Sequence, residues 1–186
     1  MKFEHLLLGF VAMRPCTGYD LKRWLNSEMG RMLRPSTQQS QIYRTLARMS
    51  DDGWVSVTIE RNDGRPDSKI YRVTDPGRQV LHVVLTEPYR ASPDFGDPEF
   101  IIRYTLAIFI TPQQQIDLVR TELDARLEQA TRFRNRDIRP EPWMPDIDPS
   151  RMGHILDDVH QYKAHMLDTH INWLKGLLAE LTAHKP

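Results

Sequence analysis

The chain has few of the residues that mark secreted or membrane proteins. It contains one cysteine in 186 residues, so it cannot form an intrachain disulfide, and a reducing compartment such as the cytoplasm is expected. Its first apolar run, residues 3–13, is interrupted by Glu4 and His5 and lacks a small-residue cleavage site. This run therefore predicts neither a signal peptide nor a membrane span, and no membrane partner is expected.

Sequence motifs of catalysis and metal binding are also missing. There is no nucleophile motif, no glycine loop of the kind that holds phosphates, and no pair of catalytic carboxylates. His160, His165 and His170 recur every five residues, which spreads them about 140° apart per step around a helix rather than along one face. We therefore expect no enzyme activity, no metal site and no cofactor.

Acidic residues are missing from one particular stretch, between Glu28 and Asp51, which nevertheless holds four arginines. The formal net charge of the chain is zero, but residues 1–85 have 13 Lys and Arg against 9 Asp and Glu, a net of +4, and residues 86–186 have 12 against 16, a net of −4. A surface that lies against phosphates must exclude carboxylates, so the acid-free stretch indicates a nucleic-acid partner. The four arginines are Arg31, Arg34, Arg44 and Arg48.

The first half of the sequence predicts helices followed by a β-hairpin. Residues 40–49 have helical spacing, with Ile42, Leu46 and Met49 on the inner face and polar side chains on the outer face. Residues 54–59 and 69–74 alternate in hydropathy and predict two strands, joined by turn residues at 62–68. A polar helix beside a hairpin is the layout of a winged helix-turn-helix. The expected helices cover 3–13, 18–28, 40–49 and 75–85, with Tyr19 or Leu21, Leu25 and Met29 as the inner stripe of the second, Cys16 in a turn and 30–35 as a connector.

The second half of the sequence predicts a linker and an all-helical domain. Residues 86–98 contain three prolines and a glycine, which is typical of an interdomain linker. The last helix, about 150–183, is apolar on a wider arc than the other helices of this half can cover, so a second copy of the chain is the economical partner and a homodimer is expected. The predicted fold class is mainly α with a small β-hairpin: a winged helix-turn-helix at 1–85, a linker at 86–98 and an all-α dimerisation and effector domain at 99–186. The two apolar rows of the last helix are Ile155, Val159, Tyr162, Met166, Trp173 and Leu177, and Leu167, Ile171, Leu174, Leu178 and Leu181.

Five separated blocks carry a resemblance to a known family. In this order and spacing the chain resembles the PadR family of transcriptional regulators over residues 3 to about 85, and residues 99–103 with the last helix resemble more loosely the Vir-type helical domain of its longer members. The resemblance implies a dimeric winged-helix repressor whose affinity for operator DNA is lowered by a small effector. The blocks are Leu7-Leu8-Gly9-Phe10, Pro15-Cys16-Thr17-Gly18-Tyr19-Asp20-Leu21, Gln41-Ile42-Tyr43-Arg44-Thr45-Leu46, Asp52-Gly53-Trp54-Val55 and Ile70-Tyr71-Arg72-Val73-Thr74-Asp75-Pro76-Gly77-Arg78.

The candidate DNA contacts lie on the third helix and around the hairpin. The N-terminal end of a recognition helix enters the major groove, where all four base pairs differ. Tyr43 either donates its hydroxyl to a phosphate or packs as a half-buried ring, and Arg48, one turn on, is expected to meet backbone rather than base. Arg65 and Lys69 near the hairpin tip are candidates for phosphate or minor-groove contact, and Lys22 is either a phosphate contact or a solvated lysine. The residues expected to read base edges are Gln38, Gln39, Ser40, Gln41 and Arg44.

An effector pocket is expected between the two domains. Aromatic and methionine side chains at helical spacing can line such a pocket or simply form core, and the family includes sensors of phenolic acids and of hydrophobic cationic drugs, so the expected ligand is aromatic or hydrophobic. Two other functions remain open: a winged-helix protein-interaction module without an effector, and a small helical enzyme with a divergent N-terminal domain. The candidate lining residues are Tyr104, Trp143, Tyr162, Met166 and Trp173.

Overall fold

The computed structural model describes residues 1–34, 36–61, 67–93, 95–134 and 148–183. These fall into two compact units: Met1–Tyr89 with Asp97–Gln114, and Arg90–Gly96 with Gln115–Pro186. The expected boundaries were 85 and 98, so the structure adds residues 97–114 to the N-terminal unit. The division into a DNA-binding domain, a linker and a dimerisation domain remains a prediction about function.

The N-terminal unit is built around α1 (Phe3–Met13), which is buried along most of its length. The leucines of this helix pack with α4 (Gln39–Asp51) and α5 (Asp75–Thr86) in one hydrophobic core. Thr74 caps α5 by accepting the Gly77 N–H, with Pro76 in the first turn. Gly77 lies so close to the Trp54 carbonyl that an added Cβ would be 2.1 Å from that oxygen.

Three helices follow where the sequence predicted two. The expected helix over 18–28 ends early, as α2 (Gly18–Leu25), and the expected connector over 30–35 contains α3 (Glu28–Leu33). The break has a local cause: the Ser27 hydroxyl accepts the Gly30 N–H and caps a new helix. The inner stripe contains Leu25 and Leu21, one of the two alternatives expected there. The other alternative, Tyr19, is exposed, and so is Met29, which was expected inside.

The recognition-helix candidate is α4 (Gln39–Asp51), close to the expected 40–49. It ends at Asp52, and Gly53 follows with φ of +72°, a left-handed conformation that glycine adopts without steric cost. The chain then enters the hairpin directly, with Trp54 N–H donating to the Met49 carbonyl at 2.8 Å. Gly53 therefore marks the end of the helix.

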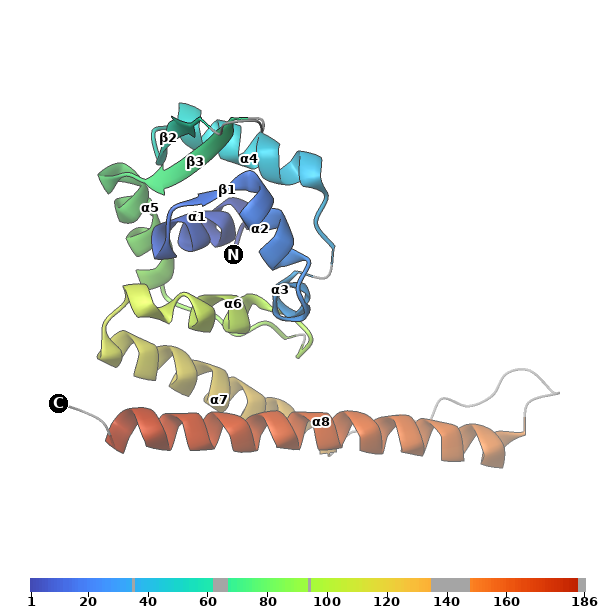
Figure 1. Ribbon diagram of the computed structural model, residues 1–186. Coiled ribbons are helices and arrows are strands. Elements are labelled where there is room, and N and C mark those ends of the chain that lie inside the picture. The colour runs from blue at the N-terminus through green and yellow to red at the C-terminus, as the bar shows by residue number, and fades with distance from the viewer. Residues whose placement is uncertain (35, 62–66, 94, 135–147, 184–186) are drawn as a thin grey trace. The chain divides into compact units, whose positions relative to one another are not determined.

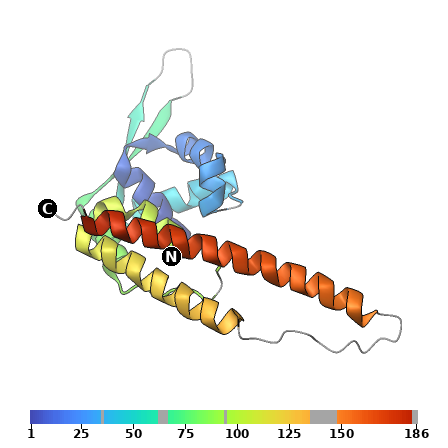
Figure 2. The same cartoon turned by 90° about the horizontal axis from the view of Figure 1, so that it is seen from below.

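The hairpin belongs to a three-stranded antiparallel sheet. Strands β2 (Val55–Glu60) and β3 (Ser68–Val73) pair as predicted, with Val57 opposite Tyr71. A third strand, β1 (Cys16–Thr17), pairs with β3 at the other edge, in the order β1-β3-β2. The sequence placed Cys16 in a turn, because a two-residue strand has no periodicity to detect. Figure 2 shows the hairpin extending beyond the helices of its unit.

The N-terminal unit is completed by α6 (Glu99–Thr105) and a 3-10 turn at Ala107–Phe109. Leu106 between them is fully buried and lies against Gly9 of α1, where an added Cβ would be 2.4 Å from its Cδ2. This packing explains why residues 97–114 join the N-terminal unit. The sequence assigned residues 99–110 to the C-terminal domain, whereas the structure includes them in the N-terminal unit.

The C-terminal unit consists mainly of two long helices, α7 (Pro112–Arg134) and α8 (Pro149–Ala183), which run alongside each other (Figures 1 and 2). A buried ion pair lies within it, between Arg126 Nε and Glu122 Oε1 at 3.0 Å. Arg126 also donates to the Ser92 carbonyl, which ties residues 90–96 to α7. One predicted apolar row of α8 supplies the core of this unit: Leu167, Ile171 and Leu174.

Candidate nucleic-acid interface

The recognition-helix candidate α4 separates its buried and exposed faces cleanly. Ile42, Leu46 and Met49 are completely buried, as the spacing predicts. Arg44 and Arg48 are exposed on the other face, and no acidic residue comes between Glu28 and the last helical residue, Asp51. The exposed side of α4 is therefore polar and basic along most of its length.

The N-terminal end of α4 presents amide side chains. Gln38, Gln39 and Ser40 are exposed, and Gln41 is partly exposed. Lys22 of α2 donates from Nζ to Oε1 of Gln39 at 2.6 Å. Two residues that the sequence put forward separately are thus brought together by the helix-turn-helix, and the lysine orients the glutamine side chain.

The residues along the exposed face of α4 have different surroundings. Arg44 donates from Nε to the Ser40 carbonyl at 3.3 Å, which leaves the rest of its guanidinium to solvent. The Tyr43 ring packs so closely on Gly18 that an added Cβ would be 2.5 Å from its Cε1, yet the side chain remains 41% exposed. Its packing role is therefore in place, and the role of its hydroxyl as a phosphate donor stays a prediction.

Arg48 has a partner that the sequence did not indicate. It forms an ion pair with Glu4 of α1, a residue that is 44 positions away in the chain. Glu4 lies in the first turn of α1, so this pair joins α1 to α4. The pair restrains Arg48 in the protein without DNA, and its expected contact with the DNA backbone remains untested.

The hairpin adds basic side chains near α4. Lys69 is exposed on β3, opposite Ile59 of β2, and Arg61 is exposed just beyond the end of β2. Arg65 lies outside the described residues. Tyr19, which is 66% exposed in the first turn of α2, is a further candidate contact that the sequence assigned to the core. The N-cap residue Thr17 was the available signal that Tyr19 lies in the first turn of a helix.

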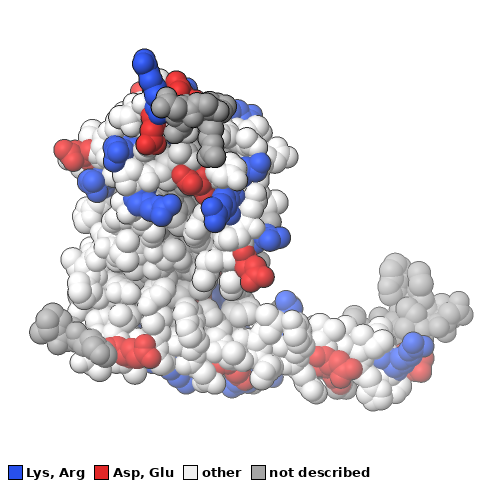
Figure 3. Space-filling view, in the orientation of Figure 1, with Lys and Arg blue, Asp and Glu red and all other residues white. Residues whose placement is uncertain are grey.

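Charges of both signs are visible on the surface of the N-terminal unit. Figure 3 shows lysine and arginine side chains on the exposed face of this unit with acidic side chains among them. The electrostatic signal therefore comes from the acid-free stretch that includes α4, not from a basic patch that covers the whole unit. This is a local arrangement, and it agrees with the modest net charge of residues 1–85.

The five expected effector residues are not brought together in one unit. Tyr104 belongs to the N-terminal unit and stacks on Phe100 at 6.0 Å between ring centroids. Tyr162 and Trp173 lie on α8, 62% and 43% exposed, and Trp143 lies outside the described residues. Met166 is the one that borders a cavity, of about 340 Å³, in the C-terminal unit. The expected effector set stays a prediction.

The remaining chemistry of the described residues is limited. Burial raises the pKa of the Cys16 thiol to about 11, with the nearby Asp20 carboxylate adding to the effect, so its reactive thiolate form is scarce at neutral pH. Within the described residues, no three His, Cys, Asp or Glu side chains are grouped so as to hold a metal ion. None of the described helices is long and apolar enough to cross a membrane.

Part of the N-terminal unit matches a known protein family. Residues 7–83 match the "Transcriptional regulator PadR-like family". This stretch is a PadR-like domain. The match runs from α1 to α5 and includes the whole winged helix.

The likeness to PadR proteins continues beyond this domain. The chain is 24% identical to "Negative transcriptional regulator PadR" of Bacillus subtilis over 95% of both chains, and 35% identical to "Probable transcriptional regulator Rv1176c" of Mycobacterium tuberculosis over 47% of this chain and 46% of that one. The crystal structure of Bacillus subtilis PadR in complex with operator DNA has 24% identity and a TM-score of 0.46, covering 96% of this chain and 98% of that one. The crystal structure of the same protein in complex with p-coumaric acid has 23% identity and a TM-score of 0.40, covering 96% of this chain and 94% of that one.

Proposed function

We propose that this PadR-like protein is a dimeric repressor that inserts α4 into the major groove of operator DNA. The observation that carries the proposal is the exposed face of α4, which is free of acids, rich in amides and arginines, and continues directly into the hairpin. A phosphate surface repels carboxylates, and Gln and Arg side chains suit the edges of adenine and guanine. An enzyme activity is not part of this proposal.

The roles in DNA binding follow from position. Gln38, Gln39, Ser40, Gln41 and Arg44 lie in the first two turns of α4 or just before it, so they read base edges. We assign phosphate contacts to Tyr43, Arg48, Lys22 and Lys69, and also to Arg65, which the sequence predicts to lie near the hairpin tip. Phosphate contacts fix the register of the protein on the duplex, and base contacts select the sequence.

The dimer is proposed from the apolar row of α8 that its own unit leaves uncovered. Ile155, Val159 and Tyr162 are each more than half exposed. A row of this kind on a long helix is typical of a surface that packs against another chain. Two-fold symmetry then places two recognition helices on half-sites separated by about 34 Å, or a multiple of it.

The proposed regulator releases its operator when a small effector binds. The support is the resemblance to PadR proteins, of which one has been solved with p-coumaric acid. A winged-helix protein-interaction module remains the alternative. A regulator that binds genomic DNA acts in the compartment that holds this DNA, which agrees with the cytoplasmic location expected from a single cysteine.

Selection of fragments from the source genome tests the DNA-binding function. The full chain is mixed with sheared genomic DNA, and bound fragments are recovered and sequenced. The expected result is enrichment of a short, roughly palindromic site, bound with a steep loss of affinity as salt rises because several phosphates are neutralised. No enrichment above a non-specific background would favour the protein-interaction module instead.

A further inference from the structure

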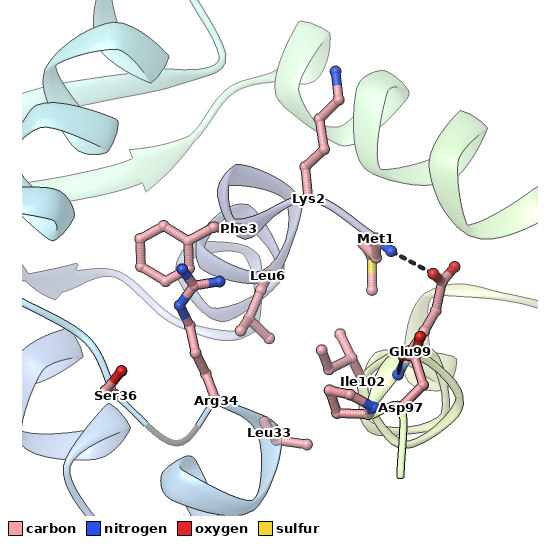
Figure 4. Close-up of a pocket in the computed structure, with 11 residues that line it drawn as sticks. Met1, Lys2, Phe3, Leu6, Leu33, Arg34, Ser36, Asp97, Glu99 and Ile102 are labelled. Atoms are coloured by element: carbon pink, nitrogen blue, oxygen red, sulfur yellow. Dashed lines mark hydrogen bonds and ion pairs between the residues drawn. The ribbon is translucent and has the colours of Figure 1, made fainter. Parts of the chain in front are cut away.

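A cavity of about 360 Å³ lies wholly within the N-terminal unit. Figure 4 shows it between the start of α1, the end of α3 and the start of α6. Its size is within the range of small-molecule pockets, which is roughly 300–1,000 Å³. Leu6, Leu33 and Ile102 form the aliphatic walls, and positively and negatively charged residues line the rest of the cavity.

The acidic groups at this cavity already have partners. Glu99 accepts hydrogen bonds from the Met1 amino group at 2.6 Å and from Arg103 Nε at 3.0 Å. Partial burial alone would raise the pKa of Glu99, but these two hydrogen bonds outweigh burial and lower the pKa, so the carboxylate stays ionised and paired. Asp97 Oδ1 accepts the Glu99 N–H at 2.9 Å. The carboxylates at the cavity therefore already have hydrogen-bond partners within the protein.

The basic side of the cavity is not satisfied in the same way. The Arg34 guanidinium lies over the Phe3 ring, 4.4 Å from its centroid, and the buried Nε of Arg34 has no hydrogen-bond partner among the described residues. No acidic side chain of the described ranges pairs with Arg34. Figure 4 shows this guanidinium beside Phe3 at the cavity wall, whereas the Lys2 side chain points away. The Nε atom itself is inaccessible to solvent, so an anion in the cavity accepts from the terminal N–H groups of this charged guanidinium.

The walls indicate the rest of the ligand. The one aromatic ring that lines the described cavity, Phe3, has a face covered by Arg34, so stacking on an aromatic ligand is not the available contact. The other apolar walls are aliphatic. We propose that this cavity binds a small carboxylate with an aliphatic body, whose carboxylate accepts from Arg34 and whose body packs on Leu6, Leu33 and Ile102.

A ligand in this cavity acts on the recognition helix because residues of the cavity wall lie just before α4 in the chain. The cavity wall includes Arg34 and Ser36, and Ser36 precedes the first residue of α4, Gln39, by three positions. Thr37, between them, has a buried hydroxyl with no partner among the described residues. A ligand held by Arg34 therefore biases the position of the residues that lead into α4. This regulatory step rests on the proposed function, because it requires that α4 binds an operator.

Direct binding tests the site without any DNA. Calorimetry with the full chain uses cyclohexanecarboxylate as the probe, with cyclohexanecarboxamide, cyclohexylmethylamine and benzoate as matched neutral, cationic and aromatic probes. We expect the carboxylate to bind at least about tenfold more tightly than the amide, since an ionised acceptor strengthens the hydrogen bonds to Arg34. No measurable carboxylate binding, equal binding of the amide, preference for the amine, or tighter binding of benzoate would each overturn the proposed ligand class.

Two variants place the ligand at Arg34. Arg34→Gln is expected to weaken carboxylate binding about tenfold or more. Arg31→Gln is the control: Arg31 is exposed on α3, the helix that Arg34 follows, and its replacement leaves binding unchanged. Circular dichroism and thermal unfolding establish that both are folded. If Arg34→Gln does not fold, Ser36→Leu at the rim serves instead and is expected to weaken binding by narrowing the cavity. Unchanged binding in the folded variant would overturn the proposal.

Operator binding then tests the regulation separately. Saturating cyclohexanecarboxylate is expected to lower the operator affinity of the natural chain and to leave the affinity of Arg34→Gln unchanged. An operator that is bound equally well with and without the probe would refute the regulation while the DNA-binding function stands. If the chain binds no operator at all, the proposed function fails, and the calorimetry still decides whether the cavity is a carboxylate site.

Discussion

Lys22 Nζ donates a hydrogen bond to Gln39 Oε1 at 2.6 Å, which joins the first helix of the helix-turn-helix to the first residue of α4. The bond occupies the glutamine oxygen and leaves its amide nitrogen facing outward as a donor. A lysine that already restricts the rotamers of this side chain reduces the conformational entropy that the side chain loses on binding. We infer that Lys22 positions Gln39, in addition to the phosphate contact proposed for it.

We expect Lys22→Met and Gln39→Ala to relax the preference for the same base pair of the operator. Because the two side chains act together, the losses of binding free energy in the single variants should not add in the double variant. Band-shift titrations against operators changed at one position at a time measure this. Fully additive losses, or effects at different positions, would show that the two residues act independently.

Arg44→Ala should abolish specific operator binding while the dimer remains folded. Arg44 is exposed near the N-terminal end of α4, and a lost bidentate contact to a base costs about 1–3 kcal/mol of discrimination, or about tenfold to a hundredfold in affinity. Arg78→Ala on α5, where the arginine is exposed near Asp75, is the matched control and should have no effect. Unchanged affinity and specificity in Arg44→Ala would remove this residue from the base-reading set.

Glu4→Gln should strengthen operator binding. The change removes the partner of Arg48, which then becomes available to a DNA phosphate, and it removes a negative charge from the vicinity of the duplex. The cost in folding stability should be below about 1 kcal/mol, because the arginine of the pair is more than half exposed. Glu28→Gln, an exposed acid on α3, is the control. Weaker operator binding by Glu4→Gln in band-shift assays would mean that the ion pair positions α4 rather than competing with DNA.

The capping box of α2 should make part of the folding stability depend on pH. Hydrogen bonds from the Thr17 backbone N–H and hydroxyl lower the pKa of Asp20 below its usual 3.8. A lowered pKa in the folded state contributes stability that is fully present above the unfolded pKa and is lost as pH falls through the folded pKa. Asp20→Asn should therefore be less stable than the natural chain at neutral pH, and the gap should narrow below about pH 4 in denaturant unfolding. A gap that stays constant down to pH 2 would contradict this.

Gly77→Ala should destabilise the winged helix, and Gly176→Ala should not. A methyl group at Gly77 would lie 2.1 Å from the Trp54 oxygen, which is held by the Thr74 N–H at 3.0 Å, so relief requires a backbone shift that costs about 1–3 kcal/mol. Gly176 in α8 has open space around it, and alanine there should add about 0.5–1 kcal/mol of stability. Thermal unfolding of both variants measures the difference, and equal midpoints would refute the close approach at Gly77.

Local sequence signals predicted the elements that depend on local contacts. The spacing of Ile42, Leu46 and Met49 predicted α4 and its buried face, and the glycine at 53 marked where it ends, because helix periodicity and left-handed caps are properties of a few neighbouring residues. The same signals failed at β1, which has two residues, and at α3, where Ser27 caps a new helix across the expected end of the second helix and the expected connector. The pairing of β1 with β3 is a long-range contact that periodicity does not take into account.

The sequence by itself indicated a nucleic-acid partner, because the absence of carboxylates between Glu28 and Asp51 can be seen in the composition without a structure. It also determined the order of helices and strands that makes a winged helix. Only the tertiary structure decided that Lys22 holds Gln39, that Glu4 pairs with Arg48, and that Arg34 faces a cavity beside the approach to α4. These relationships join positions far apart in the chain, and long-range contacts arise from the packing of whole elements rather than from any local pattern.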